Sequence, residues 1–417
     1  MINNRKKIVF VINYFYPDYA STGQLMTELC RNLQKDFDIT VIAAQPGYAG
    51  EYTKKTKVIE EDYLENIKII RLSLPEVDKT SKLSRVKYIF SYFFLANITL
   101  VKEKNIDAIY TISQPPVLGG LIGTIGKFFK RSKHIYNIQD FNPEQAMAVS
   151  YTNKQIIFNW AKKIDKLNCS YSDCVIVVGN DMKQTLEKRF EDKSVPNHVV
   201  INNWTDEDEI KPIFKKDPII NKFLLENGLG NKFIVMYSGN IGLYYDLENI
   251  IKISQHFKEY EDLAFVFIGE GAVKSEMQSY IEENTIKNVH FLPYQPKEFI
   301  KYSLNAADVH LVVNQKGIKG VSVPSKIYGV MAAGKPILGV LEKDSEAEIL
   351  ISESNSGHVV EPQDYEGIIN KVEHFYQMDK EELNNLGNNG RNYLDKYLKR
   401  DISINKYRET LYEVLNS

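Results

Sequence analysis

The feature that most constrains the fold is an alternation of short apolar runs with longer helical patterns, which occurs twice along the 417 residues. Runs rich in Ile and Val, separated by helices, are typical of parallel strands buried on both faces of a sheet. We therefore expect an α/β protein with two tandem Rossmann-like, doubly wound domains facing a cleft. Strands are predicted at 8–12, 39–43, 67–71, 108–112, 134–138, 175–178 and 199–201, and again at 234–237, 264–268, 289–292, 309–312, 336–340 and 358–360.

The segments between these runs have apolar positions at helical spacing. A polar, acidic stretch at 205–218 contains Pro212 and Pro218 and separates the two sets of strands. Its composition is typical of a hinge between domains. Helices are predicted at 24–33, 154–168, 247–256, 273–282, 297–304, 325–333 and, as more than one helix, across 382–416.

The composition excludes several classes of protein. A net charge of −2 argues against a nucleic-acid binder that works by overall positive charge. The three cysteines have no metal-ligand spacing, so we expect no disulfide framework, no metal site and a reducing, cytoplasmic location. The apolar run at 8–12 has no cleavage site after it and predicts a strand rather than a signal peptide. The apolar stretch 88–101 is too short to span a bilayer.

The small net charge hides an asymmetry between the halves of the chain. Residues 1–200 contain 28 Lys and Arg against 21 Asp and Glu, and the remainder contains 24 against 33. Basic residues flank aromatic ones at 82–101 and 127–133, a pattern that favours peripheral contact with anionic lipid on the inner face of the plasma membrane. A buried helix with a solvated basic edge explains the same pattern equally well.

Two loops of the first half have the composition of a ligand site. The loop at 17–23 ends in Gly23, and small residues there allow a ligand to approach the backbone closely. It fits neither the dinucleotide-binding pattern nor the ATP phosphate loop. Asp140 and Glu144 follow the strand at 134–138, where Asp140 could position a sugar hydroxyl. The alternative for both carboxylates is an ordinary helix cap around Asn142.

Three loops of the second half have the same character. Gly239-Asn240 and Gly269-Glu270-Gly271 follow strands and either allow close approach of a diphosphate or form simple turns. Ser322, Pro324, Ser325 and Lys326 lead into the helix at 325–333. A lysine in the first turn of a helix opposes the helix dipole, and a bound anion would remove that conflict. The alternative is a solvated surface lysine.

At these positions the chain resembles the family 4 glycosyltransferases of the GT-B fold over nearly its whole length. The resemblance rests on the loop at 10–23, on Asn202-Asn203-Trp204, on the two glycine loops and on the segments Pro324-Ser325-Lys326 and 331–336. The branch it resembles most comprises the fucosamine transferases of O-antigen and capsule assembly. The motifs shared with that branch are Gln114-Pro115-Pro116, Asp140 with Pro143-Glu144, Gly239-Asn240-Ile241-Gly242 and Ser345-Glu346.

The resemblance implies an acceptor-binding domain at 1–205, a donor-binding domain at 206–395 and a helix at 396–417 that crosses back to the first domain. The donor would be a UDP-sugar and the acceptor a lipid-linked saccharide, and transfer would retain the anomeric configuration without a metal or cofactor. Gly23 matches the glycine near the donor phosphates. Asp140 stands where many relatives have a histidine facing the donor sugar, and Tyr294 stands where the base is recognised.

The chain departs from the family pattern at two places. Asn240 and Tyr245 occupy the positions where many relatives have Arg and Lys to bind the diphosphate, so Lys326 is the remaining counter-charge. The paired glutamates of the family fall on Val321 and Gly329, and Glu346 is the suggested replacement for the second.

These departures leave other functions open. One is a catalytically degenerate scaffold that binds nucleotide sugars, and another is a GT-B-fold epimerase that converts a UDP-sugar without an acceptor. A phosphorylase would need a cofactor lysine and a longer chain. A periplasmic-type binding protein also has two α/β lobes, but this sequence has no signal peptide.

Overall fold

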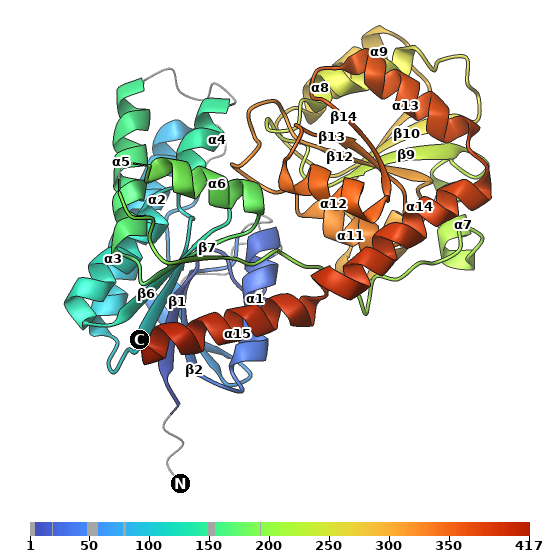
Figure 1. Cartoon of the computed structure of the whole chain (residues 1–417). Coiled ribbons are helices and arrows are strands. Elements are labelled where there is room, and N and C mark those ends of the chain that lie inside the picture. Colours follow the sequence, from blue (N-terminus) through green and yellow to red (C-terminus); the bar gives the residue numbers. More distant parts are fainter. Residues whose placement is uncertain (1–4, 19, 48–56, 78–80, 149–154, 192) are drawn as a thin grey trace. The chain divides into compact units, whose positions relative to one another are not determined.

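A computed structural model describes residues 5–18, 20–47, 57–77, 81–148, 155–191 and 193–417. Contacts divide the chain into two compact units, each built on its own sheet (Figure 1). The second unit consists of Ala148–Tyr151 and Asn202–Ser403, and the first of Met1–Met147, Thr152–Ile201 and Ile404–Ser417.

The first unit has an eight-stranded sheet in the order β3-β4-β2-β1-β5-β6-β7-β8. All neighbouring strands are parallel except β3 and β4, which are antiparallel. The strands β1, β2, β5 and β7 are buried almost throughout, as the Ile- and Val-rich runs predicted. The strands are β1 (Lys7–Val11), β2 (Asp38–Ala44), β3 (Ile59–Leu64), β4 (Ile67–Leu72), β5 (Ala108–Ile112), β6 (Lys133–Ile138), β7 (Cys174–Val177) and β8 (His198–Val200).

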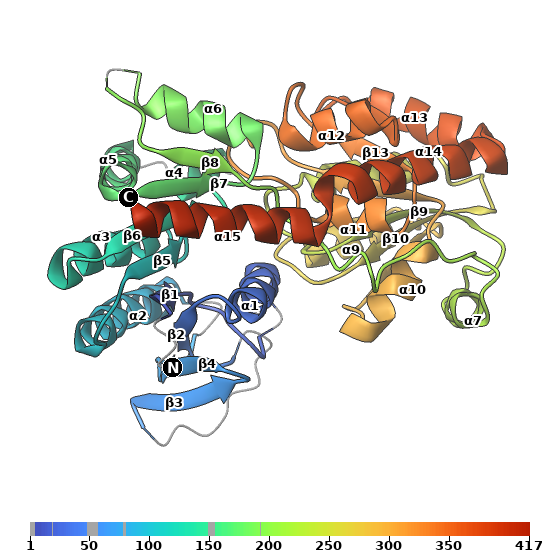
Figure 2. The ribbon, with the colours of Figure 1, turned by 60° about the horizontal axis from the view of Figure 1, so that its bottom comes forward.

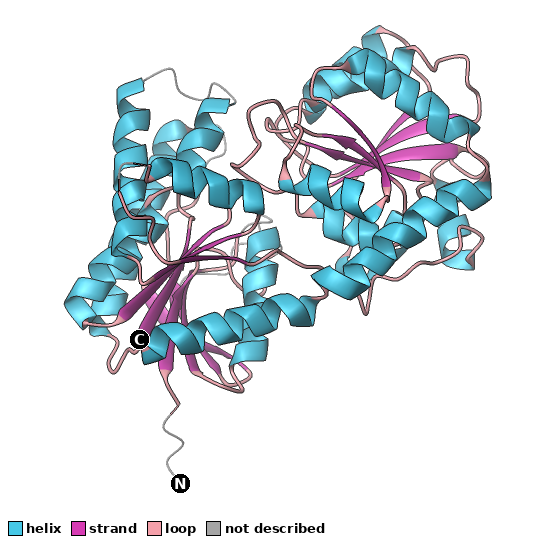
Figure 3. Cartoon of the chain, viewed as in Figure 1, coloured by secondary structure: helices cyan, strands magenta, loops and turns pink. Residues whose placement is uncertain are grey.

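Helices pack against this sheet and complete the first unit (Figure 3). The helices α2, α3 and α5 lie side by side, because α3 packs against both of its neighbours (Figure 2). The helix predicted at 154–168 is α5, although Lys154 lies outside the described residues. The helices are α1 (Ser21–Leu33), α2 (Lys82–Lys102), α3 (Leu118–Lys130), α4 (Asn142–Ala148), α5 (Gln155–Tyr171) and α6 (Asn180–Arg189).

The second unit has a six-stranded, wholly parallel sheet in the order β11-β10-β9-β12-β13-β14. All six strands were predicted within two residues of their observed bounds. The expectation of two Rossmann-like α/β domains is therefore confirmed. The strands are β9 (Phe233–Ser238), β10 (Leu263–Ile268), β11 (Val289–Leu292), β12 (Val309–Val313), β13 (Ile337–Val340) and β14 (Gly357–Val360).

Two predicted helices of the second unit differ from the structure. The segment at 247–256 is α8 (Leu247–Ile250) followed by a 3₁₀ helix (Ile251–Gln255), and the segment at 297–304 begins as a 3₁₀ turn (Lys297–Phe299) before α10 (Ile300–Asn305). Apolar spacing alone does not separate these two helix types, because short pieces of both bury one face. The other helices are α7 (Pro218–Glu226), α9 (Lys274–Glu283), α11 (Lys326–Ala332), α12 (Glu346–Ser354), α13 (Tyr365–Gln377) and α14 (Lys380–Tyr393).

The C-terminal helix α15 (Arg400–Asn416) joins the two units, because its residues from Ile404 onward belong to the first unit. Tyr407 is fully buried there, and its hydroxyl accepts a hydrogen bond of 3.0 Å from Asn137 of β6. Arg408 forms an ion pair of 2.8 Å with Asp36, which follows α1. Among the described residues, no helix is both long and apolar enough to cross a membrane.

Candidate functional site

Two glycines at the carboxyl ends of β9 and β10 allow the backbone after these strands to approach closely. Gly239 and Gly269 have positive φ angles of 146° and 145°, which side chains rarely allow. A Cβ on Gly269 would lie 1.9 Å from the carbonyl oxygen of Gly239, so only glycine fits there. Ligands of parallel α/β sheets bind outside the carboxyl ends of the strands, and this edge is therefore the place to look for a site.

Lys326, the first residue of α11, extends over this glycine edge. Its Nζ lies 3.6 Å from the ring centroid of Tyr237 and 4.4 Å from that of Tyr245. The same atom would lie 3.6 Å from a Cβ placed on Gly239. The cation therefore sits between two aromatic rings and the strand end, which is a cation–π arrangement.

The ammonium of Lys326 has no hydrogen-bond acceptor among the described residues, although Nζ is buried. Burial lowers the pKa of Lys326 well below its usual range, because desolvation disfavours the charged form. Two tyrosine faces compensate only part of this cost, since a buried ammonium needs hydrogen-bond acceptors. An anion at the end of β9 would supply the missing acceptor. The alternative of a solvated surface lysine does not agree with this geometry.

The remaining residues predicted near Lys326 occupy several environments. Tyr294 is half exposed, its ring lies 3.5 Å from the Cβ position of Gly269, and its hydroxyl donates to the carbonyl of Glu270 at 3.4 Å. Asn240 is exposed, and its carbonyl accepts from the Tyr237 hydroxyl at 2.6 Å. Ser322, Pro324 and Ser325 lie on the segment before α11, but the Ser325 side chain makes no capping hydrogen bond.

Glu346 is bonded to a side chain at the start of the second unit. It begins α12 and is buried, and its carboxylate accepts a hydrogen bond of 2.7 Å from Asn202. This contact ties α12 to the segment that opens the second unit. Val321 is also buried, and the position of Gly329 is only partly exposed. The structure therefore brings together Gly239, Gly269, Tyr294 and Lys326, and places the carboxylate of Glu346 against Asn202.

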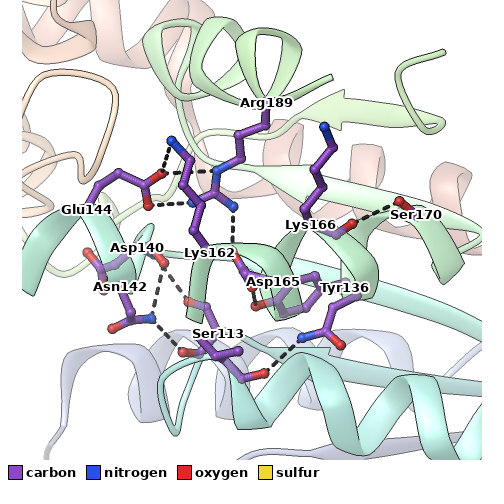
Figure 4. A network of polar contacts seen from close by, with 12 residues as sticks. Ser113, Tyr136, Asp140, Asn142, Glu144, Lys162, Asp165, Lys166, Ser170 and Arg189 are labelled. Carbon is purple, nitrogen blue, oxygen red and sulfur yellow. Dashed lines mark hydrogen bonds and ion pairs between the residues drawn. The ribbon is translucent and has the colours of Figure 1, made fainter. Parts of the chain in front are cut away.

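In the first unit, Asp140 lies on a loop that is fastened to the end of the neighbouring strand (Figure 4). Its backbone N–H donates to the Ser113 hydroxyl at 3.3 Å, and its carbonyl accepts from the Asn142 amide at 3.2 Å. Asn142 also donates to the Ser113 carbonyl at 2.7 Å. Ser113 follows β5, so the ends of β5 and β6 hold this loop together. Nothing in the sequence had indicated this role for Ser113.

Glu144 is held in an ion-pair network behind the Asp140 loop (Figure 4). Arg189 of α6 bonds both of its carboxylate oxygens, at 3.2 and 2.5 Å, and also bonds Asp165 of α5 at 2.5 Å. The guanidinium lies 4.1 Å from the ring centroid of Phe141. Burial alone would lower the pKa of Arg189, but the carboxylates of Asp165 and Glu144 outweigh burial and raise it. The network therefore fixes α4, α5 and α6 to one another.

Gly23 is the third residue of α1 and packs tightly against the preceding loop. A Cβ there would lie 2.9 Å from the carbonyl oxygen of Tyr14, and its own carbonyl accepts from the Thr27 hydroxyl at 2.7 Å. The glycine therefore allows the end of β1 and the start of α1 to approach each other. Across the described part of the chain, no group of His, Cys, Asp or Glu is arranged to bind a metal ion.

The fold places the chain in a known structural class. Sucrose-phosphate synthase from Thermosynechococcus elongatus is similar over 99% of this chain and 100% of its own, with a TM-score of 0.76 and 13% identity. Anabaena Alr3699/HepE in complex with UDP and glucose is similar over 98% and 100%, with a TM-score of 0.70 and 14% identity. The chain therefore has the GT-B fold, with two Rossmann-like domains.

The sequence comparisons find similarity to glycosyltransferases. Residues 220–393, which contain the glycine edge and Lys326, match the model of the family "Glycosyl transferases group 1". The probable glycosyltransferase WbjE of Pseudomonas aeruginosa is 26% identical over 416 residues, covering 98% of both chains. The putative colanic acid biosynthesis glycosyl transferase WcaI of Escherichia coli K12 is 24% identical over 79% of this chain and 81% of its own.

Proposed function

We propose that the protein is a hexosyltransferase that moves a sugar from a UDP-sugar to a lipid-linked or glycan acceptor in the synthesis of a bacterial surface polysaccharide. The observation that carries this proposal is the buried ammonium of Lys326 at the glycine edge of the second unit, which has no hydrogen-bond acceptor in the described part of the chain. This edge belongs to the region that matches the glycosyl transferases group 1. Relatives that match most of the chain are named as glycosyltransferases, one of them in colanic acid biosynthesis.

In this proposal the donor diphosphate binds beside Lys326, against the close backbone of Gly239 and Gly269. Negative charge grows on the leaving phosphate as the glycosidic bond breaks, and a fixed cation there stabilises the transition state. Lys326 therefore takes the place of the Arg and Lys that stand at the positions of Asn240 and Tyr245 in many family 4 enzymes. The exposed ring of Tyr294 is available to stack on the nucleobase.

The finer assignments of this function are also proposals. The family 4 resemblance, with the fucosamine transferase branch, suggests an N-acetylamino or deoxyamino hexose as donor sugar. Transfer is proposed to retain the anomeric configuration and to need no metal. The first unit is proposed to bind the acceptor, with the carboxylate of Asp140 on a sugar hydroxyl. Glu144 acts as a positioning residue in this scheme, because Arg189 engages both of its oxygens.

The first test is a thermal-shift titration with UDP-, GDP-, ADP- and dTDP-sugars in the absence of added metal. A ligand that binds only the native state raises the apparent melting temperature by mass action. We expect a selective shift with one UDP-sugar, and we expect Lys326→Ala to weaken that binding roughly 10- to 100-fold through the loss of a charge-assisted contact. Lys316→Ala is the matched control, because Lys316 is an exposed lysine of the same unit.

Two results would contradict the proposal. One is the absence of a shift with every nucleotide sugar near a millimolar, which would favour a different ligand class. The other is equal binding by Lys326→Ala and Lys316→Ala, which would remove Lys326 from the donor site. With the donor known, transfer to lipid-linked oligosaccharides is assayed in the presence and absence of EDTA. The anomeric configuration of the product, read by NMR, then decides whether transfer is retaining.

A further inference from the structure

One side of the first unit exposes large apolar side chains along α2. Leu83, Val86, Phe90, Phe94 and Ile98 follow one another at intervals of three and four residues and therefore lie on one face of the helix. All five are exposed, with Leu83 78% and Phe94 60% accessible. The opposite side of the helix holds the buried Tyr92, Ala96 and Leu100, which pack on the sheet. The apolar stripe therefore lies on the side of α2 that does not pack on the sheet.

Exposed apolar side chains also occur at the end of α3 and along α5. Phe128 and Phe129 near the end of α3 are exposed, Phe129 to 71%. On α5, Ile156, Trp160 and Leu167 are exposed, Trp160 to 62%. Phe128 contacts Tyr171 of α5 edge-to-face, with 5.3 Å between ring centroids. The helices α2, α3 and α5 lie side by side in the first unit, and we call their exposed side the three-helix face (Figures 1 and 2).

The three-helix face is basic as well as apolar. The sequence of α2 holds four Lys and Arg, that of α3 two and that of α5 three. Their only acidic residue is Asp165, which is buried and bonded to Arg189. Acids of neighbouring segments pair with two of these lysines, since Lys127 lies 2.7 Å from Asp173 and Lys162 lies 3.7 Å from Glu144. Arg85, Lys87, Lys102 and Lys163 remain as exposed basic residues. Such an excess of one sign on an exposed apolar surface indicates a negatively charged partner.

A groove with several lysines lies at the α5 edge of this face, where Arg189 is neutralised by Glu144 and Asp165 and Lys162 lies 3.7 Å from Glu144. Its volume is about 320 Å³, and it is lined by Asn159, Lys162, Lys163, Lys166, Lys188 and Arg189. Lys163 connects the groove to the apolar side chains, because its Nζ lies 5.6 Å from the ring centroid of Trp160. An apolar surface bordered by lysines matches the boundary between acyl chains and headgroup phosphates of a bilayer.

We propose that the three-helix face docks on the surface of a bilayer that contains anionic lipids. The exposed Phe, Leu and Trp side chains enter the headgroup boundary, and the lysines of the groove contact lipid phosphates. A second copy of the chain does not suit this face, because basic residues would then lie against basic residues. The inference goes beyond the proposed transferase and does not rest on it, since lipid binding is measured without any sugar substrate.

The test is flotation of the full-length protein with vesicles of equal parts phosphatidylglycerol and phosphatidylcholine, compared with pure phosphatidylcholine. We expect binding to the mixed vesicles and much less to the neutral ones. Binding should weaken as sodium chloride rises from low to high concentration, because salt screens the lipid charge. The double variants Phe94→Glu with Trp160→Glu, and Lys87→Glu with Lys163→Glu, should each lose roughly tenfold or more in vesicle affinity.

The control variant is Phe214→Glu, since Phe214 is 90% exposed but belongs to the second unit, and it should bind as the wild type does. Thermal melting verifies that each variant is folded. If a double variant fails to fold, hydrogen exchange of the wild type with vesicles replaces it, and α2 and α5 should gain protection. Three outcomes overturn the proposal: no binding of the wild type to anionic vesicles, undiminished binding by Phe94→Glu with Trp160→Glu, or a wild-type dimer that this variant dissociates.

Discussion

At the scale of single residues, Lys326 is a side chain whose surroundings disfavour its charged form. Its ammonium is buried between the rings of Tyr237 and Tyr245, and its pKa is lowered by that burial. A lysine with a lowered pKa destabilises the folded state below its unfolded pKa, and this cost decreases as the pH rises. A bound diphosphate would reverse the effect on the pKa, because an adjacent anion favours the protonated amine.

We therefore predict that binding of a UDP-sugar is coupled to proton uptake at Lys326. The affinity should fall as the pH rises above the pKa of the free protein, by up to about tenfold per pH unit while one proton is taken up. Titration calorimetry at one alkaline pH, in buffers of different ionisation enthalpy, measures the number of protons directly. A heat that is independent of the buffer would contradict the prediction. Lys326→Arg should bind without proton uptake, because arginine stays charged.

Only part of the candidate site could be read from the sequence. Lys326 was recognisable because a lysine in the first turn of a helix opposes the helix dipole. The two rings around it were not, because Tyr237 lies far from Lys326 in sequence, and Tyr245 stood out only as replacing a diphosphate-binding cation of relatives. Arg189 was missed for the same reason, since its partners Glu144 and Asp165 lie on other helices. The positions of Gly239 and Gly269 were clear, but their mutual approach needed the sheet order.

At the scale of elements, the glycine edge depends on how closely β9 and β10 end beside each other. We predict that Gly269→Ala abolishes nucleotide-sugar binding and destabilises the second unit, because its Cβ would overlap the carbonyl of Gly239. Gly228→Ala is the control, since Gly228 also has a positive φ but no atom within 4 Å of its Cβ position. It should cost only about 1 kcal/mol of backbone strain. Urea unfolding measures the loss of stability, and the thermal shift with a nucleotide sugar measures the loss of binding.

The ion-pair network of the first unit connects three helices, and its removal should lower the free energy of unfolding. Arg189 and Asp165 have side chains only 2% and 3% exposed, so loss of one partner leaves a buried charge uncompensated. We predict that Asp165→Ala lowers the free energy of unfolding by about 3–5 kcal/mol. Glu144→Gln should cost less, because the amide still accepts from Arg189 and Glu144 is more exposed. Equal costs in urea unfolding would contradict this view of the network.

The strands were more predictable than the short helices, for physical reasons. A continuous apolar run located β5 at its observed bounds, because a strand buried on both faces leaves little room for polar residues. The strand β3 was missed because Glu60, Glu61 and Asp62 interrupt any apolar pattern. An edge strand can carry them, since only one neighbour covers it. The 3₁₀ segment at Ile251–Gln255 has the same apolar spacing as an α-helix and could not be distinguished from one.

At the scale of the whole molecule, the two units do not follow one another simply along the chain. The second unit interrupts the first, which is completed by residues from Ile404 onward. We predict that Tyr407→Ala lowers the stability of the first unit by about 3–5 kcal/mol, because a fully buried aromatic ring is lost. Hydrogen exchange should show faster exchange in β5 and β6. The nucleotide-sugar shift of the second unit should persist, and its loss would contradict independent units.

The route of α15 also has a consequence for biosynthesis. The ribosome makes the eight strands of the first sheet before any strand of the second sheet, yet the space that Tyr407 and Leu411 fill stays open until α15 is made. The second unit can close on its own sheet as soon as its residues leave the ribosome, whereas the earlier unit must wait. During that interval Tyr110 and Asn137 are open to water, and the nascent first unit is the part of the chain that chaperones and proteases can reach.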